Sequence, residues 1–143
     1  MTLKSEVWGP HYWFFLHTCG FTYPKYPNDV TKKKFYNLLT NFSSYIPVEE
    51  IATYYDKVII EYPIEPYLDD RESLVRWIWF IHNKINERLE KPKITLEEFY
   101  VSYFEKYKSR ETTFIEKYKI IKKVVSIAFI LFLSIFIAYW YNK

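Results

Sequence analysis

Cysteine and glycine are almost absent from this chain of 143 residues, which contains one cysteine and two glycines. A single thiol cannot form a disulfide within the chain, so no intrachain disulfide framework is possible. We interpret Cys19 as a small, buried, apolar residue, and a lone reactive thiol or an intermolecular bridge is the alternative. The scarcity of glycine, with seven prolines lying mostly between periodic segments, indicates an all-α fold.

A surplus of charge of one sign is also missing. Twenty Lys and Arg residues balance 17 Asp and Glu residues, which leaves a net charge of +3. Because the lysines are scattered among acids, no basic stripe is present, and we predict no nucleic-acid partner. Aromatic residues make up 22% of the chain. Many of them fall at helical spacing, so we interpret them as core residues rather than a base-stacking surface. No metal site is predicted.

Five helices are expected before residue 108, each with a start or stop signal. The first covers 5–22 and ends before a Pro- and Asn-rich stretch. Capping and proline positions predict the others. These are a second helix capped by Asn28 or Asp29 that runs to about residue 45, a third with Pro47 in its first turn that runs toward Ile60, a fourth capped by Asp69 or Asp70, and a fifth that begins at the capping box of Thr95 and Glu98 and runs to about Lys108.

Apolar stripes predict which faces of these helices form the core. Gly20 of the first helix would let another backbone or a ligand approach closely. The expected core stripes are Phe35, Leu38, Leu39 and Phe42 in the second helix, Leu74, Ile78, Ile81, Ile85 and Leu89 in the fourth, and Phe99, Tyr103, Phe104 and Tyr107 in the fifth.

The fourth helix carries a second face beside its core stripe. Trp79, His82, Asn83 and Asn86 follow each other at spacings of three and four, so an aromatic ring, an imidazole and two amides share one side. Buried polar groups of this kind need partners. A planar, polar, aromatic ligand could supply them, and a solvated helix face with an isolated tryptophan is the alternative.

Two motifs resemble one known family. Residues 8–18 read WGPHYWFFLHT, and residues 79–92 read WFIHNKINERLEKP. Together they resemble the Erv/Alr family of FAD-dependent sulfhydryl oxidases, over roughly residues 5–108, and in particular the small single-domain members, including those of large DNA viruses. The resemblance implies a four-helix bundle around FAD with a short fifth helix across it. It also implies oxidation of a dithiol to a disulfide, with oxygen as acceptor and hydrogen peroxide as product.

The resemblance also implies a set of cofactor-binding residues. It assigns the histidine and asparagine side chains to the adenosine half of FAD, and the lysine to the polar groups of the cofactor. The implied residues are Trp8, Gly9, Trp13 and His17 near the N-terminus, Tyr55 in the third helix, and Trp79, His82, Asn83, Asn86, Leu89 and Lys91 in the second motif.

The chain departs from the family where the family has its redox-active CxxC pair. That pair follows a proline at the start of a helix, and here Val48 and Ile51 stand in its place after Pro47. Valine and isoleucine supply no nucleophile and no redox couple for thiol–disulfide exchange. We therefore expect a protein that binds FAD but is impaired or inactive in thiol oxidation. The sequence leaves open whether the loss is natural or engineered. A non-catalytic, membrane-anchored, dimeric scaffold is the alternative.

The family resemblance further implies partners. Members usually dimerise through their first helices, so a homodimer is expected. They also need a mobile disulfide or a separate dithiol protein. Because this chain has no second cysteine pair, a shuttle would have to be external, such as a thioredoxin-like or viral thiol protein.

The last segment is predicted to be a membrane anchor. Residues 124–141 carry no charge, and as a helix they would be about 27 Å long, near the minimum for a bilayer. Four lysines precede this segment, and only Lys143 follows it. The positive-inside rule therefore places the N-terminal domain on the cytoplasmic side, and a viral membrane is an alternative location. We expect a domain over 1–108, a charged helical or flexible stalk over 109–123, and the anchor over 124–141. A buried C-terminal helix is the alternative. The four lysines are Lys117, Lys119, Lys122 and Lys123.

Overall fold

The computed structural model describes residues 3–108 and 110–142, and no strand is present among them. The expected all-α class is confirmed. The chain divides into two compact units, Met1–Tyr103 and Phe104–Lys143, which we describe separately. Its helices are α1 (Ser5–Thr22), α2 (Asp29–Thr40), η1 (Phe42–Tyr45), α3 (Glu49–Glu61), η2 (Glu65–Tyr67), α4 (Arg71–Arg88), α5 (Leu96–Phe104), η3 (Glu105–Tyr107) and α6 (Arg110–Tyr141).

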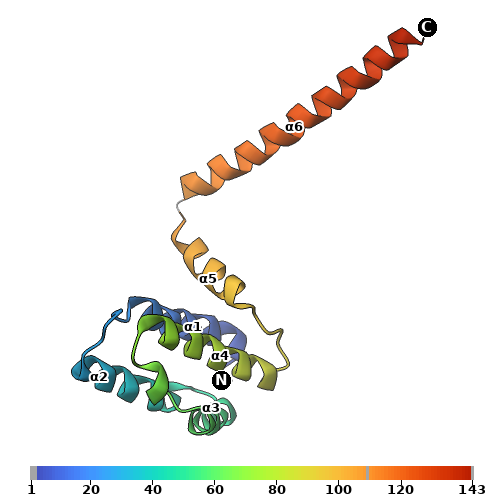
Figure 1. Ribbon diagram of the computed structural model, residues 1–143. Helices are drawn as coiled ribbons and strands as arrows, with labels where there is room; N and C mark the ends of the chain where they lie inside the picture. The colour runs from blue at the N-terminus through green and yellow to red at the C-terminus, as the bar shows by residue number, and fades with distance from the viewer. Residues whose placement is uncertain (1–2, 109, 143) are drawn as a thin grey trace. The chain divides into compact units, whose positions relative to one another are not determined.

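The four longer helices of the first unit form a bundle around one core (Figure 1). Helix α1 lies along α4, and α3 packs against α4 and η1. Gly20 is the point of closest approach, because a Cβ atom there would lie 2.9 Å from Ile78 Cδ1. Its small size therefore serves helix packing rather than ligand access. The buried stripe of α4 matches the prediction through Leu74, Ile78, Ile81 and Ile85.

Three of the predicted helix starts are made by the expected capping groups. The side chain of Asn28 accepts a hydrogen bond from Thr31 N (2.9 Å), and that of Asp70 accepts one from Ser73 N (2.9 Å). At α5, Thr95 N donates to Glu98 Oε2 (2.7 Å) while Glu98 N donates to Thr95 Oγ1 (3.1 Å). These groups satisfy backbone donors that a helix end leaves unpaired.

Two expected boundaries were wrong. Helix α2 ends at Thr40, because the Asn41 amide donates to Asn37 O (2.7 Å) and the chain then tightens into η1. Pro47 lies before the N-cap of α3 rather than in its first turn, since Val48 is itself the N-cap, with extended backbone (φ −111°, ψ 111°). Glu49 and Glu50 occupy the first turn of α3, as expected.

The apolar stripes were partly wrong at the ends of α2 and α5. Leu39 and Phe42 are buried as expected, whereas Leu38 is only half-buried. Phe99 and Tyr103 are buried, but Phe104 and Tyr107 are 52% and 61% exposed. The α-helix ends at Phe104 and continues as η3. Tyr107 lies in η3, where α-helical spacing no longer holds. Phe104 is still part of α5, but it directly follows Tyr103 and so points about 100° away from it.

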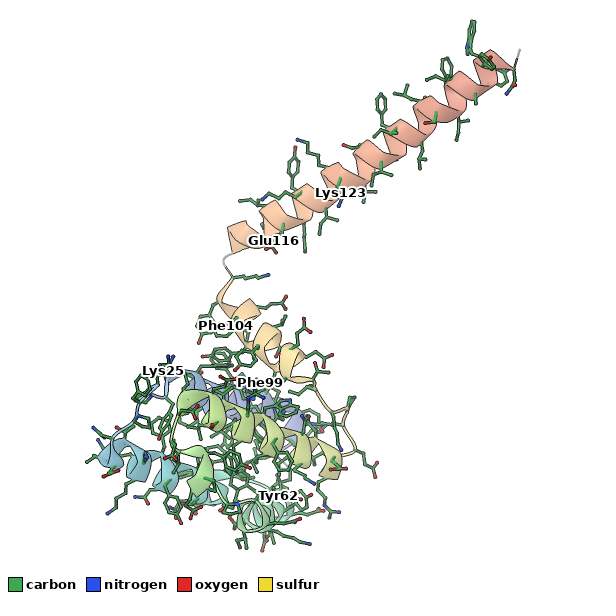
Figure 2. The ribbon with its side chains drawn as sticks, viewed as in Figure 1. Lys25, Tyr62, Phe99, Phe104, Glu116 and Lys123 are labelled. Atoms are coloured by element: carbon green, nitrogen blue, oxygen red, sulfur yellow. The ribbon has the colours of Figure 1, made fainter. Side chains whose placement is uncertain are left out.

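The second unit is dominated by α6, which runs unbroken from Arg110 to Tyr141. Residues 110–123 are thus helical. Every side chain described from Phe114 onward is exposed, and the side chains project on all sides of the helix (Figure 2). The segment Phe114–Tyr141 is long and apolar enough to cross a membrane.

Candidate functional site

A pair of histidines joins α1 to α4. His17 Nε2 lies 3.1 Å from His82 Nδ1, within hydrogen-bond distance. Trp13 lies one turn before His17 on α1, and its ring stacks on His82 with centroids 3.9 Å apart and planes at 14°. The packing of α1 against α4 therefore brings the two motifs together. The result is a mostly buried aromatic cluster.

Burial decides the charge of this cluster. Desolvation lowers the pKa of His82 to about 4, and the nearby positive charge of Lys91 acts in the same direction. His82 is therefore neutral at pH 7. A neutral imidazole has one donor and one acceptor nitrogen, so it can hydrogen-bond to its partner and still present an aromatic face.

Helix α5 covers the histidine pair. The ring of Phe99 lies 4.3 Å from that of His17, and the Tyr103 hydroxyl is 3.0 Å from Thr18 Oγ1. The ring of Tyr103 also stacks on Phe14, with centroids 5.3 Å apart. The spacing of Phe99 and Tyr103 in the sequence predicted only that both lie in the core. The helical stripe of α5 was the available signal, but a stripe does not say which helix it will face.

The amide-bearing face of α4 contacts the linker between α4 and α5. Trp79 Nε1 donates to Ile94 O (2.9 Å), and Asn83 makes two hydrogen bonds with the backbone of the same residue. Asn86 donates to Pro92 O at 3.4 Å. The buried amides thus have partners within the chain. This outcome was not among the two alternatives weighed from the sequence.

Trp8 and Gly9 differ from the other candidates, because Trp8 has an unpaired hydrogen-bond donor and Gly9 has open space beside it. The indole N–H of Trp8 is buried, and no acceptor among the described residues pairs with it. At Gly9, apart from its chain neighbours and the nearby backbone of α1, no described atom lies within 4 Å of the place where a Cβ atom would be. One turn along α1, Tyr12 packs edge-on against Trp8 with centroids 5.0 Å apart. Space and an unused donor therefore occur side by side.

The remaining candidates lie on α3 and at the end of α4. Tyr55 is buried, and its hydroxyl donates to Leu39 O (2.9 Å), while burial raises the pKa of this phenol. Val48 is half-buried at the N-cap of α3, and Ile51 packs against the core one turn later. Leu89 is half-buried against the core, and Lys91 is exposed.

Cys19 is half-buried on α1, and burial raises the pKa of its thiol. A raised pKa reduces the thiolate fraction and hence the reactivity, which favours the interpretation of Cys19 as a packing residue. In the part of the chain that the structure describes, no group of three or more His, Cys, Asp or Glu side chains could hold a metal ion.

The sequence model of the Erv1/Alr family matches residues 10–108, which are more than half of the chain. The chain belongs to the Erv1/Alr family. The matched residues include Trp13, His17 and the whole second motif, whereas Trp8 and Gly9 lie just before them.

Solved structures and curated relatives agree with this membership. The crystal structure of the yeast Erv1 core is 31% identical and covers 72% of this chain and 86% of its own, with a TM-score of 0.65. The FAD-binding domain of Erv1 from Saccharomyces cerevisiae is 33% identical, covers 68% of this chain and 91% of its own, and gives a TM-score of 0.63.

Among curated relatives, the mitochondrial FAD-linked sulfhydryl oxidase erv1 of Schizosaccharomyces pombe is 38% identical over 56% of this chain and 44% of its own length. ERV1 of S. cerevisiae is 36% identical over 62% of this chain and 46% of its own. The probable FAD-linked sulfhydryl oxidase R368 of Acanthamoeba polyphaga mimivirus is 29% identical over 67% of this chain and 68% of its own. The chain thus spans less than half the length of these two yeast relatives.

Proposed function

We propose that this chain binds FAD between α1, α4 and α5, and that it is a membrane-anchored member of the sulfhydryl oxidase family without the thiol-oxidising step. The observation that carries the proposal is the Trp13–His17–His82 cluster, which joins both family motifs under the cover of Phe99. The names of the relatives, FAD-linked sulfhydryl oxidases, support the choice of cofactor.

The residues present fit a flavin nucleotide. The unpaired N–H of Trp8 is a donor that a ligand acceptor would satisfy, and the open space at Gly9 would admit a group that any side chain would block. We propose that Trp8, Gly9, Trp13, His17, Tyr55, Trp79, His82, Asn83, Asn86, Leu89 and Lys91 hold the cofactor, with the exposed Lys91 near its phosphates.

The chain's own contribution to chemistry would be binding, orientation and exclusion of water. Trp13 and His82 present stacked, uncharged rings, and Phe99 shields His17 from solvent. When bound, FAD supplies a two-electron acceptor that oxygen can reoxidise.

The missing element is a dithiol at the start of α3. Val48 and Ile51 are one helical turn apart, since Ile51 N donates to Val48 O (3.0 Å). A helix N-terminus is a position that lowers a thiol pKa and favours a reactive thiolate. Since this chain has apolar side chains there, we propose that electrons do not enter from a protein dithiol.

The first test is the visible absorption spectrum of the full-length protein in detergent, followed by identification of the released chromophore. A stoichiometric FAD spectrum is expected. The double variant Val48→Cys/Ile51→Cys should then consume oxygen with a small dithiol as substrate, whereas Val48→Cys alone should not. If FAD binds but the double variant oxidises no dithiol, the placement of the redox pair is wrong.

We also propose the organisation and partners of the chain. The FAD-binding domain covers 1–108, the charged stalk 109–123 and the membrane anchor 124–141, with the N-terminal domain facing the cytoplasm. Exposed apolar side chains on one side of α1 and just before it support a homodimer through this helix, namely Leu3, Val7 and Phe15. Any dithiol partner would be a separate thioredoxin-like or viral protein.

A non-catalytic anchored scaffold is the second candidate. The observation that favours it is that the amides of Asn83 and Asn86 are already engaged by the linker. It predicts a colourless, folded, helical protein that tolerates His82→Ala and Asn86→Ala, and a stable protein partner recovered with the wild-type chain.

A further inference from the structure

The backbone of Ile94 is held on both sides by side chains of α4. Its N–H donates to Asn83 Oδ1 (2.8 Å), and its carbonyl accepts from Asn83 Nδ2 (2.9 Å). The same carbonyl accepts a further hydrogen bond from Trp79 Nε1 (2.9 Å). Asn83 thus pairs with Ile94 as a neighbouring strand would, and Trp79, one turn earlier, supports it. We call this three-bond arrangement the Ile94 clasp.

The clasp fixes the point at which α5 begins. Ile94 directly precedes Thr95, whose capping box with Glu98 opens α5. From that start, α5 brings Phe99 to 4.3 Å from the His17 ring and Tyr103 to Thr18. Loosening Ile94 would therefore loosen the helix that covers the histidine pair.

The clasp uses no sulfur. The chain has a single cysteine, which lies on α1, so no disulfide can tie α4 to the linker. Hydrogen bonds between an indole, an amide and a backbone are unaffected by thiol reductants. The attachment of α5 should thus be independent of the redox state of the compartment.

We propose that Trp79 and Asn83 are positioning residues, whose clasp on Ile94 holds α5 over the Trp13–His17–His82 cluster and so retains the flavin. This inference rests on the proposed FAD site and adds a positioning role for two of the residues proposed to hold the cofactor. The polar ends of both side chains are already directed at Ile94.

Trp77 provides a matched control on the same helix. Its indole N–H also donates to a backbone carbonyl, that of Tyr62, at 3.0 Å. Replacing either tryptophan by phenylalanine removes one such hydrogen bond and keeps an aromatic ring. Only Trp79 contacts the linker to α5, so the two variants separate the clasp from general stability.

The experiment compares wild type, Trp79→Phe and Trp77→Phe as full-length proteins in detergent. Amide hydrogen exchange is measured at Ile94 and along α5, together with the rate of FAD release and the free energy of unfolding. We expect Trp79→Phe to speed exchange at Ile94 and in α5 by about tenfold and to speed FAD release, while Trp77→Phe leaves both unchanged. Asn83→Asp, which keeps the acceptor for Ile94 N–H but loses the donor to Ile94 O, should act like Trp79→Phe.

Equal effects of Trp79→Phe and Trp77→Phe at matched loss of stability would overturn the proposal. So would a change in flavin absorption or release by Trp79→Phe without faster exchange at Ile94, because that result indicates direct contact. A reductant should change none of these rates. If wild type carries no FAD, the proposed function fails, and the exchange data still decide whether the clasp holds α5.

Discussion

The two glycines of the chain both lie on α1 but in opposite surroundings. We expect Gly9→Ala to change the stability of the fold by less than about 1 kcal/mol, because the better helix propensity of alanine is offset by the clash of its Cβ atom with the ring of Pro10, the next residue of α1. The same change should weaken FAD binding, because the methyl group would fill the proposed ligand space. Gly20→Ala should instead destabilise by about 1 kcal/mol, because Ile78 Cδ1 would be 2.9 Å away.

Urea unfolding and FAD titration of both variants test this contrast. A Gly9→Ala protein that folds and binds FAD as tightly as wild type would show that α1 near residue 9 does not line the FAD site.

The neutral state of His82 makes stability depend on pH. Its folded-state pKa lies near 4, below the ordinary value of 6.5, so the unfolded chain binds a proton first as the pH falls. The stabilisation is complete above pH 6.5 and is lost between about 6.5 and 4. The free energy of unfolding should drop by about 2 kcal/mol from pH 7 to pH 5. His17 and Lys91 face this imidazole.

Unfolding curves at several pH values measure this effect. His82→Gln, which cannot titrate, should flatten the dependence, whereas His11→Gln, on the exposed side of α1, should not. An equally steep dependence in His82→Gln would assign it to another group.

Residue roles were predictable where a single helix defines them. Helical spacing placed Trp13 beside His17 on α1, and Trp79, His82 and Asn83 on one face of α4, without further information. It did not show that Asn83 pairs with the backbone of Ile94, nor that His82 pairs with His17. Both contacts join segments whose relative placement is set by the packed core, and no local pattern encodes them.

At the scale of whole elements, helix starts were predictable and helix ends were less so. Asn28, Asp70 and Thr95 act through hydrogen bonds within three residues, so short sequence windows contain the whole interaction. The ends of α2 and α5 pass into the 3₁₀ turns η1 and η3. Such turns carry no strong sequence signal, which is why the exposure of Tyr107 was not foreseen.

The turn that follows α4 contains a residue in an unfavourable backbone conformation. Glu90 has φ 54°, and the following Lys91 N–H returns to Asn86 O (2.8 Å). Glycine is the residue that adopts this left-handed position without steric cost. Glu90→Gly should therefore raise the free energy of unfolding by about 0.5–1 kcal/mol. Glu97→Gly, in the first turn of α5, should lower it by a similar amount.

Chemical denaturation of the two variants measures both changes in the free energy of unfolding, which are expected to have opposite signs. A destabilised Glu90→Gly protein would mean that the Glu90 side chain contributes more than its backbone costs.

At the scale of the molecule, local pattern and family likeness give the same bundle. The long contacts that close it, such as Tyr103 with Thr18 and Tyr23 with Leu68 O, were not in the sequence analysis. They depend on which faces meet, and a stripe of apolar residues fixes only that a face is buried. The proposed membrane segment is a different case, because an uncharged run is recognised from the local sequence and does not depend on which other segment it contacts.

The last prediction concerns the proposed membrane anchor. If residues 124–141 cross a bilayer, the expressed protein should stay in the membrane fraction after carbonate extraction. A lysine at the middle of the segment costs about 2.5–3.5 kcal/mol. Phe132→Lys should therefore release a large share of the protein. Tyr118→Lys, an exposed position in the lysine-rich part of α6, should release none. If carbonate released wild type and both variants to the same extent, α6 would be covered by protein rather than lipid. A second copy or a partner would then bind the same exposed surface.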